Sequence, residues 1–349
     1  MSETPLRVLQ IGLGNRGTMW TQIIDAHPNA TLCGVMDIDP ARVAAFAETH
    51  PGVPAFRTLP EALAAGSAEM VLLVTPPAGH LEQARAIFAG GLPLLAEKPL
   101  TLDLGEAVEI VALARSSRTP LAVGLNFRYL SVSQKIRQLI QQKVVGEPGF
   151  AQFIYQRNRD GLRPGLNKYP LTMLHPMMLE QSIHHLDLLR FCYDREVVAV
   201  SCRTWNPPWS MYAHDSNVHC LLTLAGGMEV NYLGTWTGGW NELQFQWRTD
   251  CDGGVIVQRQ LFADLALAHT GDPELTPVPI APCEPFLDDS SQLLSSFIAH
   301  LRTGAPLECS GADHLITLAL CFAAIESSET GHTIPMAPFC ARHGIEFPA

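Results

Sequence analysis

A glycine-rich turn directly behind an apolar run constrains the fold of this chain more than any other feature. The stretch LRVLQIGLGNRG places glycines at 12, 14 and 17 after a short β-forming run. In a strand-turn-helix of this pattern, Gly12 permits the tight turn, Gly14 lets a pyrophosphate approach the backbone, and Gly17 allows close packing of helix on strand. The helix N-terminus adds amide donors and a positive dipole. The predicted dinucleotide-binding residues of this turn are Gly12, Leu13, Gly14, Asn15, Arg16 and Gly17.

An acidic residue ends the next predicted strand, twenty residues beyond Gly17. Asp37 can accept hydrogen bonds from the adenosine ribose hydroxyls and would repel a 2′-phosphate, so NAD is favoured over NADP as the cofactor. Arg16 and Arg42 lie close enough in sequence to offer a 2′-phosphate a partner. NADP therefore stays open as the second choice.

The first third of the chain alternates short apolar runs with segments of helical period, which predicts a parallel sheet covered on both faces. The runs MVLLVT and LPLLA are apolar throughout, as expected of strands buried on both sides. We therefore predict an α/β fold that begins with a Rossmann domain over residues 1–124. Its predicted helices span 16–27, 40–50, 80–90 and 102–117.

The pattern changes from about residue 131, where a helix over 131–145 precedes a strand over 149–159. After a second helix over 176–192, runs from 193 to 262 indicate consecutive strands joined by glycine-containing turns. The sequence predicts an α+β domain over 125–349 with a mainly antiparallel sheet. Two helices close the chain, over 287–303 and 311–329, the latter capped by Ser310 and ended by Gly331.

So few helices would leave one face of this sheet open. Apolar and aromatic side chains on an open face would form an exposed patch, so we expect the face to be an oligomer interface of a homodimer or homotetramer. The aromatic residues expected to contribute are Trp236, Trp240, Phe245 and Trp247.

Composition excludes several classes of function. With 34 acidic against 23 basic side chains the formal net charge is −11, which repels nucleic acid and anionic membranes. The sequence has neither a signal-peptide pattern nor an apolar run of membrane-spanning length, so we expect a cytoplasmic protein. The nine cysteines include no C-x-x-C pair, which indicates reduced thiols and no structural metal site.

Lys98 follows the predicted strand LLA in the stretch LLAEKPL, at the strand end where open parallel sheets bind ligands. Its ammonium group is placed to face the nicotinamide and to stabilise charge on a carbinol oxygen, or to shuttle a proton. A solvated loop lysine is the other interpretation of its position alone. Glu97 precedes it and is predicted to belong to the same cofactor site.

The predicted helix over 176–192 carries a polar stripe. At 100° per residue Glu180, His184 and Asp187 share one face. A carboxylate beside an imidazole fixes the tautomer of the ring and raises its basicity, as a general base for alcohol oxidation requires. We favour His184 over His185 as that base because His184 has acidic residues at i−4 and i+3. Glu180 is predicted to orient it, and Asp187 to bind substrate hydroxyls.

The motifs, in their order and spacing, resemble the Gfo/Idh/MocA family of NAD(P)-dependent sugar and polyol dehydrogenases. They are GLGNRG, the strand-ending Asp37, VTPPAGH at 74–80, AEKPL, GLNFRY at 124–129, EQSIHHLDLLRF at 180–191 and the closing CSGADHLITLALCFAAIESSETG. The resemblance covers most of the chain and is weakest between about 193 and 285. It implies a Rossmann domain, an open-faced second domain and oligomers formed through the exposed sheet.

The resemblance also implies roles for single residues. His184 takes the hydroxyl proton while the substrate carbon passes hydride to nicotinamide C4, and Lys98 acts on the same group. Glu180 departs from the family pattern, which more often has aspartate there. His80 either lies near the nicotinamide ribose or caps the helix that begins at it. The further cofactor-binding residues that the motifs imply are Thr75, Pro76 and Arg128.

We therefore expect an oxidoreductase that acts on the CH–OH group of a small-molecule sugar, cyclitol or related polyol. A redox-neutral hydrolase or lyase that oxidises its substrate only transiently is the alternative within the family. A dinucleotide-sensing protein without catalysis is the third hypothesis. The arginines Arg157, Arg159 and Arg163 could recognise an acidic sugar or belong to a solvated loop.

Overall fold

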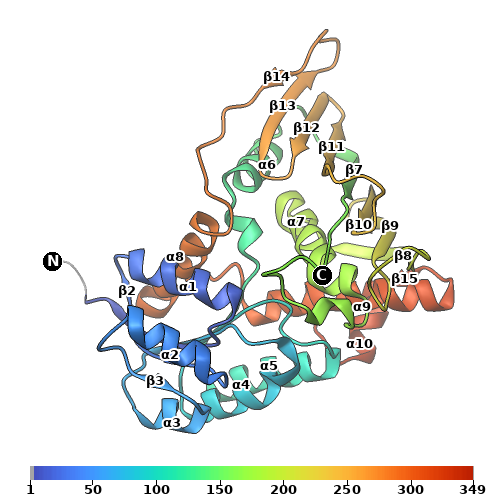
Figure 1. The fold of residues 1–349 in the computed structure, drawn as a ribbon. Coiled ribbons are helices and arrows are strands. Elements are labelled where there is room, and N and C mark those ends of the chain that lie inside the picture. The colour runs from blue at the N-terminus through green and yellow to red at the C-terminus, as the bar shows by residue number, and fades with distance from the viewer. Residues whose placement is uncertain (1–3, 349) are drawn as a thin grey trace. The chain divides into compact units, whose positions relative to one another are not determined.

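The computed structural model describes residues 4–348 and divides into two compact units. Unit 1 contains the chain up to Asn126 together with Phe286–Leu315, and unit 2 contains Phe127–Pro285 together with the residues from Ile316 onward. The sequence predicts one boundary, after residue 124, whereas the structure returns residues 286–315 to the first unit. Figure 1 shows this return: α8 (Asp288–Thr303), from the orange part of the chain, lies beside the blue helix α1.

Unit 1 is built on a six-stranded sheet in the order β3-β2-β1-β4-β5-β6, in which every pair is parallel. The strand order reverses between β1 and β4, and the carboxyl ends of strands at such a point are where α/β sheets bind ligands. The strands are β1 (Leu6–Ile11), β2 (Ala30–Met36), β3 (Ala55–Phe56), β4 (Met70–Leu73), β5 (Leu94–Ala96) and β6 (Leu121–Val123). All residues of β4, β5 and β6 are buried, as their continuous apolar sequence predicts.

The helices of unit 1 confirm the predicted alternation, with ends that differ by one or two residues. They are α1 (Asn15–Ala26), α2 (Pro40–Thr49), α3 (Leu59–Ala64), α4 (His80–Ala89) and α5 (Leu104–Ser117). The short α3 was not predicted, although Thr58 and Glu61 form a capping box at its start.

Residues 286–315 join unit 1 through several polar contacts. Asn126 donates a hydrogen bond of 2.6 Å to Asp289 of α8, and Ser310 forms a β-bridge with Ala122 of β6. The Ser310 hydroxyl then accepts from the Asp313 amide in the first turn of α9 (Gly311–Thr330), as the predicted N-cap requires. The contacts of Asn126 with Asp289 and of Ala122 with Ser310 join residues far apart in sequence, which is why local patterns did not reveal them.

Unit 2 is built on a nine-stranded sheet in the order β14-β13-β12-β11-β7-β10-β9-β8-β15. Only β7 and β10 pair in parallel, so the sheet is mainly antiparallel, as predicted. The strands are β7 (Pro148–Gln156), β8 (Val197–Trp205), β9 (Asn217–Leu224), β10 (Met228–Thr235), β11 (Gln244–Cys251), β12 (Gly254–Gln260), β13 (Ala263–His269), β14 (Thr276–Pro277) and β15 (Ile334–Pro335). Its helices are α6 (Ser131–Gln141), the π-helix η4 (Met177–Ser182), α7 (Ile183–Tyr193), the greater part of α9, and α10 (Met336–Arg342).

Helices cover one face of this sheet and leave the other open. In β9, Val218, Cys220 and Leu222 are buried, whereas Leu221 between them is 53% exposed. Phe150 of β7 is 59% exposed on the same open face. This alternation is typical of a sheet with one covered and one open side.

The aromatic residues predicted for the open face lie elsewhere, and the structure corrects this expectation. Trp236, Phe245 and Trp247 are buried, and Trp240 is exposed in the turn before β11. The Trp247 indole donates a hydrogen bond of 2.8 Å to Tyr193 of α7, so it faces the helices. Because side chains alternate along a strand, Phe245 shares that inward face with Trp247.

Asp289 gives a test of how residues 286–315 are held. Burial raises the pKa of Asp289 to about 6 from its ordinary 3.8, against the Asn126 hydrogen bond and the Arg16 charge. Between these values the folded state binds more protons than the unfolded state, so the free energy of unfolding falls as pH rises through this window. Above about pH 6, ionisation of the buried carboxylate lowers the free energy of unfolding by about 3 kcal/mol.

We therefore predict that Asp289→Asn stabilises the protein, by up to about 3 kcal/mol near pH 8 and by less near pH 5. Urea unfolding of both proteins at the two pH values measures the difference. A variant that is less stable than the natural chain near pH 8 would show that the ionised carboxylate is well solvated.

Candidate active site

The glycine turn of unit 1 has the geometry that its sequence predicts. Gly12 has φ +104°, and a Cβ there would lie 2.6 Å from the Val74 carbonyl oxygen. A Cβ on Gly17 would lie 2.3 Å from the Gly12 carbonyl oxygen, because helix α1 approaches the turn closely. A Cβ on Gly14 would have an Arg42 side-chain nitrogen, 3.7 Å away, as its nearest neighbour. The turn is thus closed at its first and third glycines and open at its second, where the pyrophosphate is predicted to lie.

Gln10, a buried residue of β1 that sequence analysis missed, holds this turn. Its side-chain amide donates to the carbonyls of Gly12 at 3.0 Å and Gly17 at 2.9 Å, and the Thr21 hydroxyl donates to its oxygen. A fully buried glutamine inside an apolar strand is the signal that could have identified it.

Asp37 lies at the end of β2, as predicted, and is 5% exposed. Its carboxylate accepts hydrogen bonds from the backbone amides of Leu13 at 2.7 Å and Asp39 at 2.9 Å. The Arg42 guanidinium lies 3.5 Å from it. Asp37 therefore orders the glycine turn, and the predicted contact with the ribose hydroxyls remains a prediction.

Arg16 extends from the glycine turn to two other segments of unit 1, the end of β5 and the returning residues 286–315. It donates to Glu97 at 2.7 Å, to the Ser290 hydroxyl at 2.8 Å and to the Phe286 carbonyl at 3.3 Å. These partners occupy the Arg16 guanidinium. Arg42, the other arginine considered for a 2′-phosphate, lies beside Asp37 and has an exposed side chain.

Glu97 is buried at the end of β5 and accepts hydrogen bonds from Arg16 and from the Trp20 indole at 2.6 Å. Burial acts to raise its pKa, but the Arg16 charge, the Trp20 hydrogen bond and the Lys98 charge outweigh burial, so the pKa lies below its ordinary value. Glu97 is thus an ionised anchor for the turn. Lys98 follows it with a half-buried side chain, joined by a cis peptide bond to Pro99.

His80 links the loops after β4 and β5. One ring nitrogen lies 2.9 Å from the Thr75 carbonyl oxygen and the other 2.8 Å from that of Leu100. Burial lowers the pKa of His80 despite these carbonyls. Thr75 also donates to Gln83, and Pro76 beside it is exposed. The ring therefore positions the loop that carries Lys98, and contact of His80 with the ribose remains a prediction.

In unit 2 the predicted helix over 176–192 consists of the π-helix η4 followed by α7. The change of winding falls between Glu180 and His184, so the assumed 100° per residue does not hold over this interval. His184 is 6% exposed and stacks on Phe127 with ring centroids 4.1 Å apart. Glu180 accepts a hydrogen bond of 2.7 Å from Tyr169.

His185 has a different environment. Gln181 donates to one ring nitrogen at 3.1 Å, and the Tyr232 hydroxyl lies 2.9 Å from the other. Because Tyr232 donates its own proton to Ser182, the second ring nitrogen of His185 must be protonated to donate to Tyr232. Burial lowers the pKa of His185 to about 3. His185 is thus a neutral, fully hydrogen-bonded residue of the core, which favours His184 as the base.

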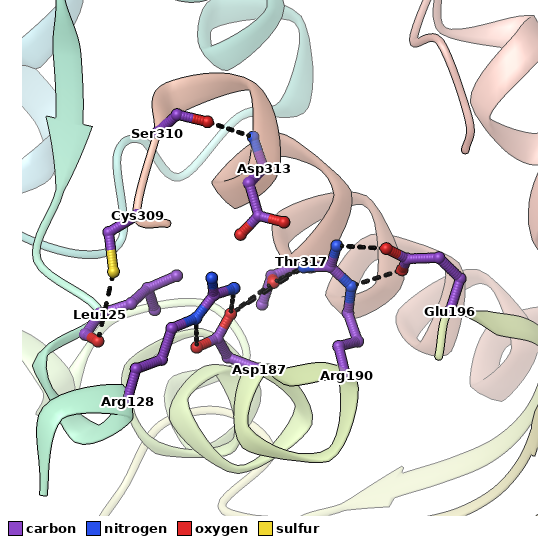
Figure 2. Close-up of polar contacts among 9 residues, drawn as sticks. All are labelled: Leu125, Arg128, Asp187, Arg190, Glu196, Cys309, Ser310, Asp313 and Thr317. Atoms are coloured by element: carbon purple, nitrogen blue, oxygen red, sulfur yellow. Dashed lines mark hydrogen bonds and ion pairs between the residues drawn. The ribbon is translucent and has the colours of Figure 1, made fainter. Parts of the chain in front are cut away.

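Asp187 is 1% exposed and pairs with Arg128, as Figure 2 shows. Two guanidinium nitrogens of Arg128 donate to the two carboxylate oxygens at 2.7 and 2.6 Å. The Thr317 hydroxyl of α9 donates to Asp187 at 2.8 Å and accepts from Arg190 at 2.6 Å. The sequence predicts that Asp187 binds substrate and that Arg128 binds the cofactor. The structure shows them bound to each other, a pairing that the sequence did not reveal.

Residues 4–348 contain no group of three or more histidine, cysteine, aspartate or glutamate side chains that could hold a metal ion. No helix among them has the length and apolar character needed to cross a membrane.

Both units contain segments that match known protein families. Residues 6–125 match an oxidoreductase family described as having an NAD-binding Rossmann fold, and residues 133–257 match the GFO/IDH/MocA C-terminal domain. The chain belongs to the Gfo/Idh/MocA family. The open second glycine, the uncapped N-terminus of α1 and the buried Asp37 fit the NAD that this family binds.

The Gfo/Idh/MocA chain is 24% identical to an uncharacterized protein, y4oX, of Sinorhizobium fredii, over 95% of this chain and 96% of that protein. It is 28% identical to the inositol 2-dehydrogenase of Corynebacterium glutamicum, over 62% of this chain and 63% of that enzyme.

A crystal structure of an Agrobacterium radiobacter oxidoreductase with NAD+, L-tartaric acid and magnesium superposes with a TM-score of 0.88 at 21% identity, covering 96% of this chain and 99% of that one. An inositol dehydrogenase homologue of Azotobacter vinelandii, crystallised with NADH and myo-inositol, gives 0.82 at 15% identity, with 95% and 98% coverage. At these identities the structures show the shared fold.

The glycine turn of this family member predicts two separable effects. Gly14 has φ −68°, so Gly14→Ala should leave the melting temperature within about 2 °C, because the methyl group meets open space. It should weaken NADH binding by at least about tenfold, because the methyl group takes the place of the pyrophosphate. Gly17→Ala should instead destabilise the fold by about 1–3 kcal/mol through overpacking.

Thermal unfolding and NADH fluorescence titration of the two variants measure these effects. Unchanged NADH affinity of a folded Gly14→Ala protein would contradict the placement of the pyrophosphate.

Proposed function

We propose that this protein is an NAD-dependent dehydrogenase that oxidises a secondary alcohol of a sugar, cyclitol or related polyol. The observation that carries the proposal is the edge of the unit 1 sheet, where the open glycine turn after β1 and Lys98 after β5 both follow carboxyl ends of parallel strands. The relatives named inositol 2-dehydrogenase support the substrate class.

The acid-base chemistry is assigned to one residue of each unit. When bound, NAD supplies a hydride acceptor at nicotinamide C4. Lys98 holds the carbinol oxygen and stabilises its negative charge, and His184 removes the hydroxyl proton. His184 suits this role because Phe127 fixes the plane of its ring, while the neighbouring His185 already uses both ring nitrogens in the core.

The two carboxylates of the helix take different roles in this proposal. Glu180 remains the residue that orients His184, and its carboxylate also accepts a hydrogen bond from the Tyr169 hydroxyl. Both oxygens of Asp187 already accept hydrogen bonds from Arg128. We therefore assign Asp187 to positioning within unit 2 in place of the substrate contact that the sequence predicts.

The open face of the unit 2 sheet is proposed to bind a second copy of the chain. Leu221 of β9 lies in register with Asn231 of β10, which lies beside Gln152 of β7. Together with the exposed Phe150, these residues form a continuous partly apolar surface of the kind that marks interfaces.

We predict that light scattering finds a dimer or tetramer and that the double variant Phe150→Asp, Leu221→Asp dissociates it, because two buried carboxylates would lack partners. Trp240→Asp, which changes an exposed residue outside this face, is the control. A monomer at micromolar concentration of the natural chain contradicts the proposal.

For the chemistry, we predict that Lys98→Met and His184→Ala each lower kcat by about 10² to 10⁴, while NADH affinity changes little. The double variant should be less impaired than the product of the single effects, since the two groups act as a unit. NADH formation at 340 nm with a panel of sugars and polyols is the assay.

His185→Ala is the matched control for His184→Ala. It should keep its kcat but lose about 1–3 kcal/mol of stability, because Gln181 and Tyr232 lose their partner. If His185→Ala were stable but inactive, the base would be His185, and the assignment to His184 would be wrong. Product formation without NADH accumulation would favour the redox-neutral alternative.

A further inference from the structure

The segment after β7 carries a cluster of positive charge without matching acidic partners. Arg157, Arg159 and Arg163 lie within seven residues of one another. Among the residues that the structure describes, no carboxylate forms an ion pair with any of the three guanidinium groups. Three arginines so close in sequence therefore concentrate positive charge locally in a chain whose net charge is −11.

Arg159 is fixed by contacts of both its backbone and its side chain. Its backbone amide donates to the Trp236 carbonyl at 2.9 Å, and its carbonyl accepts from the Tyr212 hydroxyl at 2.9 Å. The guanidinium lies 4.1 Å from the centroid of the Trp236 ring. One of its terminal nitrogens is buried and has no hydrogen-bond partner among the described residues. A partly desolvated cation without an acceptor is costly unless a ligand supplies one.

Arg157 connects this cluster to the helix that bears the candidate base. Its terminal nitrogen donates a long hydrogen bond of 3.3 Å to the Tyr155 hydroxyl, which in turn donates to Gln181 of η4. Gln181 lies next to Glu180 and three residues before His184. A neutral hydroxyl does not neutralise a guanidinium, so the charge of Arg157 remains available beside this helix.

The surrounding loop approaches the same part of unit 2. Tyr169, twelve residues beyond Arg157, donates to Glu180, and Lys168 before it donates to the carbonyls of Gly161 and Arg163. Segment 157–169 is thus folded back over the start of the helix by its own hydrogen bonds. Arg163 is exposed in this segment, whereas Arg157 and Arg159 are half-buried.

We infer that Arg157 and Arg159 bind a carboxylate of the substrate, which makes the natural substrate an acidic sugar such as a uronic or aldonic acid. Guanidinium groups suit this ligand because their paired N–H donors match the two oxygens of a carboxylate. The overall negative charge of the chain repels anions, so an acidic substrate needs a local pair of cations of this kind. The inference rests on the proposed dehydrogenase function and specifies its substrate class.

The experiment compares matched acidic and neutral substrates. NADH formation is measured with D-glucuronate against D-glucose and with D-gluconate against sorbitol, for the natural chain and for Arg157→Met, Arg159→Met and Arg163→Met. We expect the acids to be preferred. Arg157→Met and Arg159→Met should each lower kcat/KM for the acids by roughly 10-fold to 100-fold, mainly through KM, and leave the neutral compounds unchanged. Arg163→Met removes the same charge from an exposed position and should have little effect.

Arg159→Lys, which keeps the charge but loses the paired donors, guards against misfolding of Arg159→Met and should be intermediate. Preference for the neutral compounds, or equal losses on both classes, overturns the carboxylate assignment while leaving the dehydrogenase function intact. Preference for D-glucose 6-phosphate over both acids also overturns it.

Calorimetric titration of the NADH complex with D-glucuronate separates the two proposals. Binding that is lost in Arg159→Met supports the inference even if no compound is oxidised, in which case the dehydrogenase proposal fails alone. No binding and no oxidation overturn both.

Discussion

The ion pair between Arg16 and Glu97 is the interaction on which the rest of unit 1 depends. It joins the glycine turn to the end of β5, and the other nitrogens of Arg16 bind the returning segment at Phe286 and Ser290. An unpaired buried charge costs several kcal/mol, so loss of either partner would affect the turn, the strand end and the segment together. Lys98 follows Glu97 directly, and the position of its backbone is therefore set by a pair that also sets the position of the glycines.

Unit 2 uses a chain of hydrogen bonds to distinguish two adjacent histidines. Tyr155, Gln181, His185, Tyr232 and Ser182 each donate or accept in turn. A chain of this kind is polarised in one direction and tolerates only one tautomer of His185. The chain starts at Tyr155 of β7, passes through Gln181 and ends at Ser182, and the last two of these residues belong to the π-helix η4. The ring of His184 instead stacks on the ring of Phe127.

Much of this arrangement could be predicted from the sequence because its signals are local. The glycine turn, Asp37 and the apolar strands of unit 1 each depend on residues close together in the chain. The structure confirms the strands, the shape of the turn and the position of Asp37 directly after β2. The helix over 176–192 was predicted with a uniform period, which the π-helix breaks. Sequence could not reveal that residues 286–315 return to unit 1 or that Trp247 faces the helices, because both depend on pairing between distant segments.

The buried pair of Arg128 and Asp187 shows how such distant contacts reach the candidate base. Arg128 is bound through two nitrogens to α7, and Thr317 secures the same carboxylate to α9. Phe127, the neighbour of Arg128, is consequently held where its ring meets that of His184. Replacing the pair by apolar residues could preserve stability, since buried ion pairs often contribute little net free energy. It would remove the directional restraint on Phe127, so the physical value of this pair lies in the orientation of the His184 ring.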